Sequence, residues 1–222
     1  MAKRKPKAYW RRWLSWHLGK KRKANPATRA EWAFEQLARR LKAGDVAVDC
    51  GANVGKFTEL MARNGATVYA FEPDPFAFAR LQNRLGAWPN VILRNEAVGT
   101  QAKPVRLYRA PDFEADPLVR SESSSLLAFK SNVSTENYVE TNQIDFVAFI
   151  RSLPGLRVLK MDIEGAEFDL LKALIESGVM DRIDFAFVET HDHKIPELAD
   201  IAGEVRELIS SRGLDKINLD WR

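Results

Sequence analysis

The stretch from Asp45 to Glu72 constrains the fold of this chain more than any other, because it reads as strand, glycine turn, helix and strand. The apolar run Val46-Ala47-Val48 is typical of a strand buried on both faces of a parallel sheet. A helix is expected from about Lys56 to Asn64, and a second strand from Thr67 to Phe71 ends at the acidic Glu72. This pattern predicts a nucleoside-binding half of a doubly wound, mostly parallel α/β sheet with helices on both faces.

The glycine turn indicates which nucleoside is bound. It reads Gly51-Ala52-Asn53-Val54-Gly55 and follows Asp49 directly. The middle glycine of a pyrophosphate-binding G-x-G-x-x-G turn is absent, and Asp49 would repel a phosphate but attract an ammonium group. S-adenosylmethionine carries such a group, and its ribose hydroxyls suit a carboxylate at the end of the second strand. We therefore expect Asp49, Gly51, Asn53, Gly55 and Glu72 to bind S-adenosylmethionine.

A third short strand, Val91 to Leu93, also ends in polar residues. In a doubly wound sheet this end lies beside the ends of the first two strands. The side chain of Asn95 or Glu96 and the backbone of Ala97 are therefore expected to contact the adenine amine. The alternative is a structural role, in which the side chain caps a helix or holds the loop through hydrogen bonds to its backbone.

A second polar cluster follows the predicted strand that begins at Arg157. Lys160 and Asp162 interrupt its apolar residues, and charges on an interior strand are costly unless they are used or paired. We expect Asp162 and Glu164 at the cofactor pocket, His191 as base or substrate contact because of its ordinary pKa, and Lys160 as an electrostatic partner. A structural ion network of Lys160, Asp162 and Glu164 is the alternative. Asp162, Glu189, His191 and His193 are the alternative as a mixed carboxylate–imidazole metal site, but we expect no bound metal, because His191 and His193 show no recognisable metal-site spacing.

Further elements are expected on either side of these two stretches. A capping box at Thr28-Arg29-Ala30-Glu31 predicts the start of a helix that ends by Gly44, and Arg109 to Ser125 reads as a long irregular segment with candidate contacts at Ser123, Ser124 and Ser125. Other predictions are helices at 76–85, 145–152, 165–177 and 196–211, strands at 103–108, 183–188 and 216–221, and one or two short strands within 126–144.

Charge divides the chain into a 1–25 extension and a 26–222 α/β domain. Residues 1–23 hold ten Lys or Arg and no acid, although the net charge of the chain is only +4. As a helix, this segment would place Trp10, Trp13 and Leu14 on one face. That pattern favours peripheral contact with an anionic membrane, with a tail folded on the domain and nucleic-acid contact as alternatives. The single cysteine, Cys50, indicates a reducing compartment. We expect a cytoplasmic protein, at the inner membrane face if the extension binds lipid.

The sequence resembles the FkbM family of S-adenosylmethionine-dependent methyltransferases, within the class I, Rossmann-like fold. The resemblance is carried by the glycine turn, by Phe71-Glu72-Pro73, by Asn95-Glu96-Ala97-Val98-Gly99, by Ser124-Ser125-Leu126, by the block Leu159 to Glu167, and by Glu189-Thr190-His191. It implies methyl transfer to a hydroxyl of a sugar, glycan or related small molecule. The basic extension lies outside the resemblance, and the chain has one strand after its last helix where class I enzymes usually have a closing hairpin.

Two other classes of function remain open at this stage. A nicotinamide-dependent oxidoreductase would share the fold, but Asp49 and Asn53 disfavour its phosphate-binding turn. A non-enzymatic membrane or nucleic-acid binder would depend on residues 1–23. The identity of the methyl acceptor and the oligomeric state cannot be read from the sequence.

Overall fold

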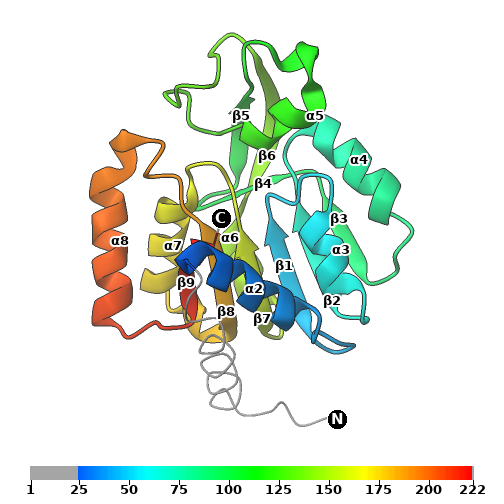
Figure 1. The fold of residues 1–222 in the computed structure, drawn as a ribbon, viewed down its shortest axis with the longest axis vertical. Helices are drawn as coiled ribbons and strands as arrows, with labels where there is room; N and C mark the ends of the chain where they lie inside the picture. Colours follow the sequence, from blue (N-terminus) through cyan, green and yellow to red (C-terminus); the bar gives the residue numbers. More distant parts are fainter. Residues whose placement is uncertain (1–24, 222) are drawn as a thin grey trace.

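The computed structural model describes residues 25–221, and its centre is a six-stranded sheet in the order β3-β2-β1-β7-β8-β9 (Figure 1). Every neighbouring pair in this sheet is parallel. The strands are β1 (Val46–Cys50), β2 (Thr67–Phe71), β3 (Val91–Arg94), β7 (Leu156–Met161), β8 (Ile183–Glu189) and β9 (Ile217–Trp221). The predicted doubly wound α/β fold is confirmed.

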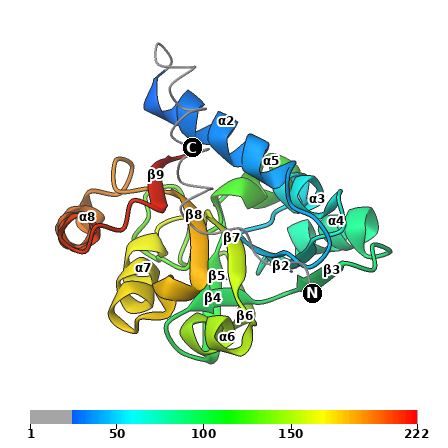
Figure 2. The same ribbon diagram turned by 90° about the horizontal axis from the view of Figure 1, so that it is seen from below.

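Helices cover both faces of this sheet, as Figure 2 shows. Successive residues of β1 point to opposite faces: Ala47 joins the apolar cluster that contains α2 and α3, whereas Val48 joins the cluster that contains α6 and α7. On the first face lie α2 (Pro26–Ala38), α3 (Lys56–Ala62) and α4 (Pro75–Leu85); on the second lie α6 (Phe146–Ser152), α7 (Glu167–Glu176) and α8 (Ala199–Ser211), which packs on α7.

The first helix starts earlier than predicted. Asn25 is its N-cap: the Asn25 side chain accepts a hydrogen bond from the Thr28 N–H at 2.8 Å, and Pro26 occupies the first turn. The predicted capping box at Thr28-Arg29-Ala30-Glu31 is therefore wrong, because asparagine followed by proline is itself a strong helix start. The helix also ends at Ala38, before Gly44.

A continuous stretch between β3 and β7, residues 97–145, forms a second sheet that we call the insert. Its order is β4-β6-β5, with β4 (Ala97–Gly99) parallel and β5 (Lys103–Tyr108) antiparallel to β6 (Tyr138–Asp145). Short helices interrupt the segment predicted to be irregular: η1 (Phe113–Ala115), α5 (Pro117–Arg120) and η2 (Ser121–Ser123). In Figure 1 the insert rises in green above the main sheet.

A buried ion pair ties the insert to the segment that follows β2. Arg109 donates from Nε and from an Nη nitrogen to the two carboxylate oxygens of Asp74, each at 2.8 Å. Asp74 is fully buried and also caps α4 through the Phe76 N–H. A bidentate pair of this kind fixes orientation as well as distance.

At the edge of the sheet opposite β3, β9 pairs with β8 in parallel. The short helix η3 (Val179–Arg182) connects α7 to β8, and η4 (Pro196–Leu198) lies between β8 and α8. The predicted single closing strand is confirmed within residues 25–221. None of the helices described combines the length and the apolar character needed to cross a lipid bilayer. The proposed membrane-binding segment, residues 1–23, lies outside the described residues.

Candidate active site at the carboxyl edge of the sheet

A cavity of about 790 Å³ lies where the parallel strands end. One wall comes from residues 51–54, after β1, and from Glu72, after β2. The insert supplies residues 121–124 and 130–132, and the remaining wall holds residues 162–164 and Glu189. Ligand sites in doubly wound sheets occur at this edge, and the volume suits a nucleoside together with a small acceptor.

The glycine turn brings two strand ends into close contact. Gly51 has φ +75°, and a Cβ atom at this position would lie 1.8 Å from the carbonyl oxygen of Asp162. The N–H groups of Gly51 and Ala52 both bind the Phe71 carbonyl at 3.0 Å. Gly51 lines the cavity as predicted, and glycine is required there because any side chain would push β7 away from β1.

Gly55 does not line the cavity. Its φ is +86°, and an added Cβ would lie 2.6 Å from a methyl carbon of Leu81 and 2.9 Å from one of Leu85. Gly55 therefore allows α4 to pack against the start of α3, and its predicted contact with the cofactor stays a prediction.

Glu72 lies at the end of β2 and lines the cavity with Asn53. Its Oε2 accepts the Asn53 N–H and its Oε1 accepts the Asp74 N–H, both at 2.8 Å. Burial raises the pKa of Glu72 to about 7 against these hydrogen bonds. Each oxygen keeps a second lone pair, so the group still has the capacity to accept two further hydroxyl donors.

Asp49 and Lys160 form a buried pair, with neither side chain exposed by more than 2%. They are opposite each other in the β1–β7 register, and the Lys160 ammonium lies 3.2 Å from Asp49 and 2.6 Å from the Gly51 carbonyl oxygen. Asp49 also accepts the Thr58 hydroxyl at 2.6 Å and does not line the cavity. The predicted direct contact between Asp49 and an ammonium group of the ligand does not fit this geometry, because Lys160 already occupies that place.

Asn95 acts as a brace, which was the alternative to adenine recognition. Its side-chain nitrogen donates to the carbonyls of Glu72 at 2.8 Å and Pro73 at 3.2 Å, and the residue does not line the cavity. Ala97 does line it, next to Val98. The predicted backbone contact at Ala97 therefore remains a prediction, and the Asn95 side chain instead holds the chain after Glu72.

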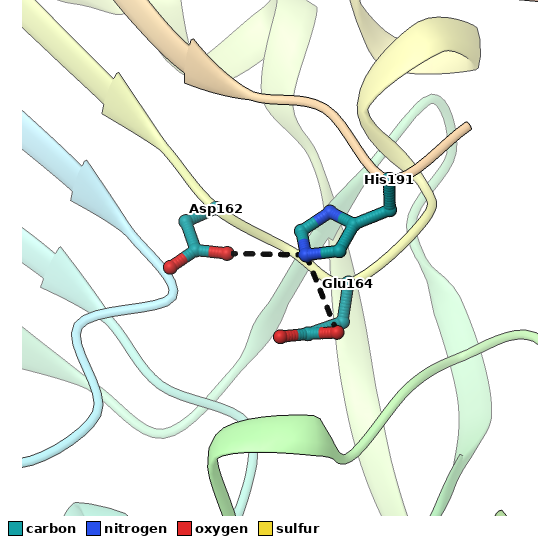
Figure 3. A group of neighbouring side chains, drawn as sticks. All are labelled: Asp162, Glu164 and His191. Atoms are coloured by element: carbon teal, nitrogen blue, oxygen red, sulfur yellow. Dashed lines mark ion pairs between the residues drawn. The ribbon is translucent and has the colours of Figure 1, made fainter. Parts of the chain in front are cut away.

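Asp162, Glu164 and His191 come together at the opposite wall (Figure 3). Asp162 follows β7, Glu164 lies in the turn before α7, and His191 follows β8. The His191 Nε2 atom is 3.9 Å from Asp162 Oδ1 and 3.4 Å from Glu164 Oε2. The two acids line the cavity, whereas His191 is fully buried behind them. The structure therefore brings together the three residues that the sequence pointed to, and their catalytic roles stay predictions.

Glu167 is the functional residue that sequence reasoning missed. Its Oε1 lies 2.9 Å from His191 Nδ1, and its carboxylate also accepts the N–H groups of Ile163 and Gly165. Glu167 thereby fixes the imidazole and directs Nε2 toward Asp162. It belongs to the sequence block that carried the family resemblance, but nothing in the spacing indicated that it would orient a histidine from a separate strand.

Electrostatics separate the roles of these groups. Burial raises the pKa of Asp162, with Lys160 opposing and Glu164 reinforcing the shift. Burial also disfavours charge on His191, but Glu164 and Glu167 outweigh it and raise the pKa of His191 to about 10. The assumption of an ordinary imidazole pKa is therefore wrong, and an imidazolium cannot act as a base. Although burial opposes it, His191 and Lys130 hold the pKa of Glu164 below its usual value.

The insert holds Glu164 in place. Lys130 forms a short contact with Glu164 Oε2, and the Ser125 hydroxyl donates to the Glu164 carbonyl at 2.6 Å. Glu164 has φ +56°, a left-handed conformation that costs about 1–3 kcal/mol for a non-glycine residue. Of the predicted serine contacts, Ser123 and Ser124 line the cavity and Ser125 does not. The role of Lys130 had no signal in the sequence.

The chain is similar in sequence to known methyltransferases. Residues 49–215 match the family model described as "Methyltransferase FkbM domain". A protein named Methyltransferase 1 from Beauveria bassiana is 28% identical over 195 residues, which are 77% of this chain and 78% of that protein. Hexuronic acid methyltransferase AglP from Haloferax volcanii is 27% identical over 187 residues, 83% of this chain and 71% of its own.

A third relative is 31-O-demethyl-FK506 methyltransferase FkbM from Streptomyces tacrolimicus, 28% identical over 197 residues, which are 78% of this chain and 74% of that protein. The matched region contains the glycine turn, Glu72 and the Asp162–Glu164–His191 cluster. This chain is therefore an enzyme of the FkbM methyltransferase family.

Proposed function

We propose that this methyltransferase binds S-adenosylmethionine over the 51–54 turn and transfers its methyl group to a hydroxyl of a sugar or glycan. The observation that carries the proposal is Glu72, whose ionisable carboxylate lies in the cavity beside the turn with lone pairs left for two ribose hydroxyls. Asp162 lies across the same cavity, where an acceptor hydroxyl would meet the sulfonium methyl.

The reaction is an in-line displacement. A lone pair of the acceptor oxygen forms the new C–O bond, the C–S bond breaks, and its electron pair stays on sulfur as the neutral thioether of S-adenosylhomocysteine. The hydroxyl proton passes to the Asp162 carboxylate, which lines the cavity. Asp162 is favoured over His191 on position, because the imidazole lies behind the two acids and is fully buried. Alignment and exclusion of water supply most of the remaining acceleration.

The acceptor class is supported by the names of the relatives. One is called a hexuronic acid methyltransferase, and another, from Sinorhizobium fredii, a 2-O-methyltransferase. The cavity wall here is rich in groups that can bind sugar hydroxyls, including Ser121, Ser123, Ser124, Ser131 and Asn132 from the insert. These side chains are donors and acceptors at once, as sugar recognition requires.

Calorimetry with S-adenosylmethionine, S-adenosylhomocysteine and NAD tests the cofactor assignment. We expect the two adenosyl compounds to bind at one site per chain and NAD not to bind. Glu72→Ala should weaken S-adenosylhomocysteine by about 1.5–3 kcal/mol, the range for hydrogen bonds to a charged group. Glu176→Ala, a substitution at the end of α7 away from the cavity, is the matched control. Binding of NAD in preference to the adenosyl compounds would overturn the assignment.

The transfer itself is tested with methyl-labelled cofactor and a panel of hydroxylated acceptors, including hexuronic acids. Asp162→Asn should bind S-adenosylhomocysteine with the same affinity as the unmodified enzyme. Its rate of methyl transfer should fall by about 10²-fold or more, the usual contribution of a positioned base. Retention of full activity in this variant would remove Asp162 from the mechanism.

A further inference from the structure

The cluster of Asp162, Glu164 and His191 has a feature that methyl transfer alone does not require. His191 is fully buried, yet its Nε2 atom makes no well-formed hydrogen bond among the described residues, since the nearest carboxylate oxygen, Glu164 Oε2, lies 3.4 Å away. Asp162 Oδ1, 3.9 Å from this nitrogen, makes no such bond among these residues either. Buried polar atoms are nearly always paired, so two unpaired atoms that face each other indicate a missing occupant.

The spacing of these atoms suits a metal ion. An octahedral Mg²⁺ or Mn²⁺ ion bonds its ligands at about 2.1 Å, so neighbouring ligand atoms lie about 3.0 Å apart and opposite ones about 4.2 Å. The Nε2 atom lies 3.4 Å from Glu164 Oε2 and 3.9 Å from Asp162 Oδ1. One ligand atom from each of the three residues falls within 4.8 Å of the others.

The surroundings are mainly acidic, although Lys160 lies 3.7 Å from Asp162 Oδ2 and Lys130 pairs with Glu164. Besides Asp162 and Glu164, the carboxylates of Glu167 and Glu189 lie within 4 Å of the imidazole nitrogens, at 2.9 and 3.9 Å. Glu167 binds Nδ1, which is the arrangement that orients metal-ligating histidines and leaves Nε2 for the ion. Lys130 holds Glu164 through one lone pair of Oε2, and the carboxylate keeps further lone pairs.

We propose that Asp162, Glu164 and His191 bind one divalent cation on the wall of the cavity. Two carboxylate oxygens suit Mg²⁺ and Mn²⁺, and the imidazole nitrogen, which must release its proton when a metal binds, favours the transition metal Mn²⁺ of the two. The sequence predicted no metal because the spacing of His191 and His193 matches no known metal site. The structure instead brings His191, after β8, beside Asp162 and Glu164, which share the loop between β7 and α7.

The exposed coordination positions face the cavity, since Asp162 and Glu164 are its lining residues while His191 closes the site from behind. The acceptor hydroxyl is the group that reaches these positions. Its bond to the cation would align the oxygen with the methyl group and make its proton easier to remove, and Oδ2 of Asp162 remains to take that proton. This role rests on the proposed function, whereas the cation site itself does not.

The test uses the full-length chain, treated with a chelator and then dialysed. Titration with MnCl₂ is followed by calorimetry and by the electron paramagnetic resonance signal of free Mn²⁺. We expect one ion per chain and a rise in Tm on binding. Asp162→Asn, Glu164→Gln and His191→Gln should each weaken Mn²⁺ by about tenfold or more.

Asp192→Asn is the matched control. Asp192 is adjacent to His191, but its carboxylate pairs with Arg206 at 2.9 Å and is not among the ligands. Its substitution should leave Mn²⁺ affinity unchanged. Thermal melting in chelator establishes that each variant is folded. If His191→Gln does not fold, Glu164→Gln still tests the site, because the Glu164 side chain is 20% exposed and its replacement disturbs the core less.

The same samples are titrated with S-adenosylhomocysteine, which separates this inference from the proposed function. No Mn²⁺ binding by the unmodified chain, or equal binding by the three ligand variants, would overturn the cation site even if S-adenosylhomocysteine binds. Mn²⁺ binding that depends on the three ligands supports the site even if S-adenosylhomocysteine fails to bind, and only the proposed function is then lost.

Discussion

Replacing Gly51 with alanine should damage this protein far more than the left-handed backbone alone explains, and Gly178 provides the comparison. Both glycines have φ +75°, but a Cβ on Gly178 meets nothing within 4 Å, whereas a Cβ on Gly51 lies 1.8 Å from the Asp162 carbonyl oxygen. The conformational cost for an alanine in this region is about 1–2 kcal/mol. Gly178→Ala should therefore lose about 1 kcal/mol, after the smaller entropy of its unfolded chain is included.

For Gly51→Ala, the cost of separating the ends of β1 and β7 adds to this conformational cost. Relief of the overlap requires a shift of more than about 1 Å, which would break the hydrogen bond from the Asp162 N–H to the Cys50 carbonyl and that from Lys160 to Gly51. A buried polar group left unpaired costs about 1–3 kcal/mol. We expect Gly51→Ala to lose at least about 4 kcal/mol, which is a large part of the stability of an ordinary domain.

Urea denaturation followed by circular dichroism measures both variants. Gly51→Ala should unfold at a much lower urea concentration than Gly178→Ala, or fail to fold where Gly178→Ala folds. Equal losses in the two variants, within about 0.5 kcal/mol, would refute the argument that β1 and β7 approach too closely for a side chain.

Three further outcomes follow from the described contacts. Lys160→Met should cost about 3–5 kcal/mol in urea unfolding by leaving Asp49 as an unpaired buried charge, and Asp49→Asn combined with it should restore part of the loss; full stability of the single variant would contradict this. Because the pKa of Glu72 is raised to about 7, this carboxylate takes up a proton and loses its charge in the folded protein as the pH falls below 7. Affinity for S-adenosylhomocysteine should then decrease below pH 7 in calorimetry, and this decrease should be absent in Glu72→Ala. Asn25→Ala should lower the unfolding free energy by about 0.5–2 kcal/mol through loss of the α2 cap, whereas no change would mean that Pro26 alone starts the helix.

Much of the main sheet could be predicted because its signals are local. Strand β2 has the predicted bounds, and so does β5. A buried parallel strand between a glycine turn and a helix leaves few alternatives for residues 45–72, and the acids at 162 and 164 follow a strand whose apolar residues are plain in the sequence.

The roles of Asp49 and Lys160 could not be predicted, because they depend on which strands become neighbours. These residues are 111 positions apart, and their pairing exists only in the β1–β7 register. From the sequence, Asp49 before a glycine turn suggests a contact with a ligand. In the folded protein it instead pairs with the buried ammonium group of Lys160. The orientation of His191 by Glu167 and the support of Glu164 by Lys130 were hidden for the same reason.

The Arg109–Asp74 pair links the two halves of the cavity through a very short path. Asp74 is two residues after Glu72 and gives its N–H to that carboxylate, while its own oxygens hold Arg109 of the insert. An insert transplanted from another family member would therefore have to restore an arginine to Asp74, because the loss of that pair would disturb the carboxylate of Glu72 as well as the position of the insert. It would also have to restore the contacts that Lys130 and Ser125 make with Glu164.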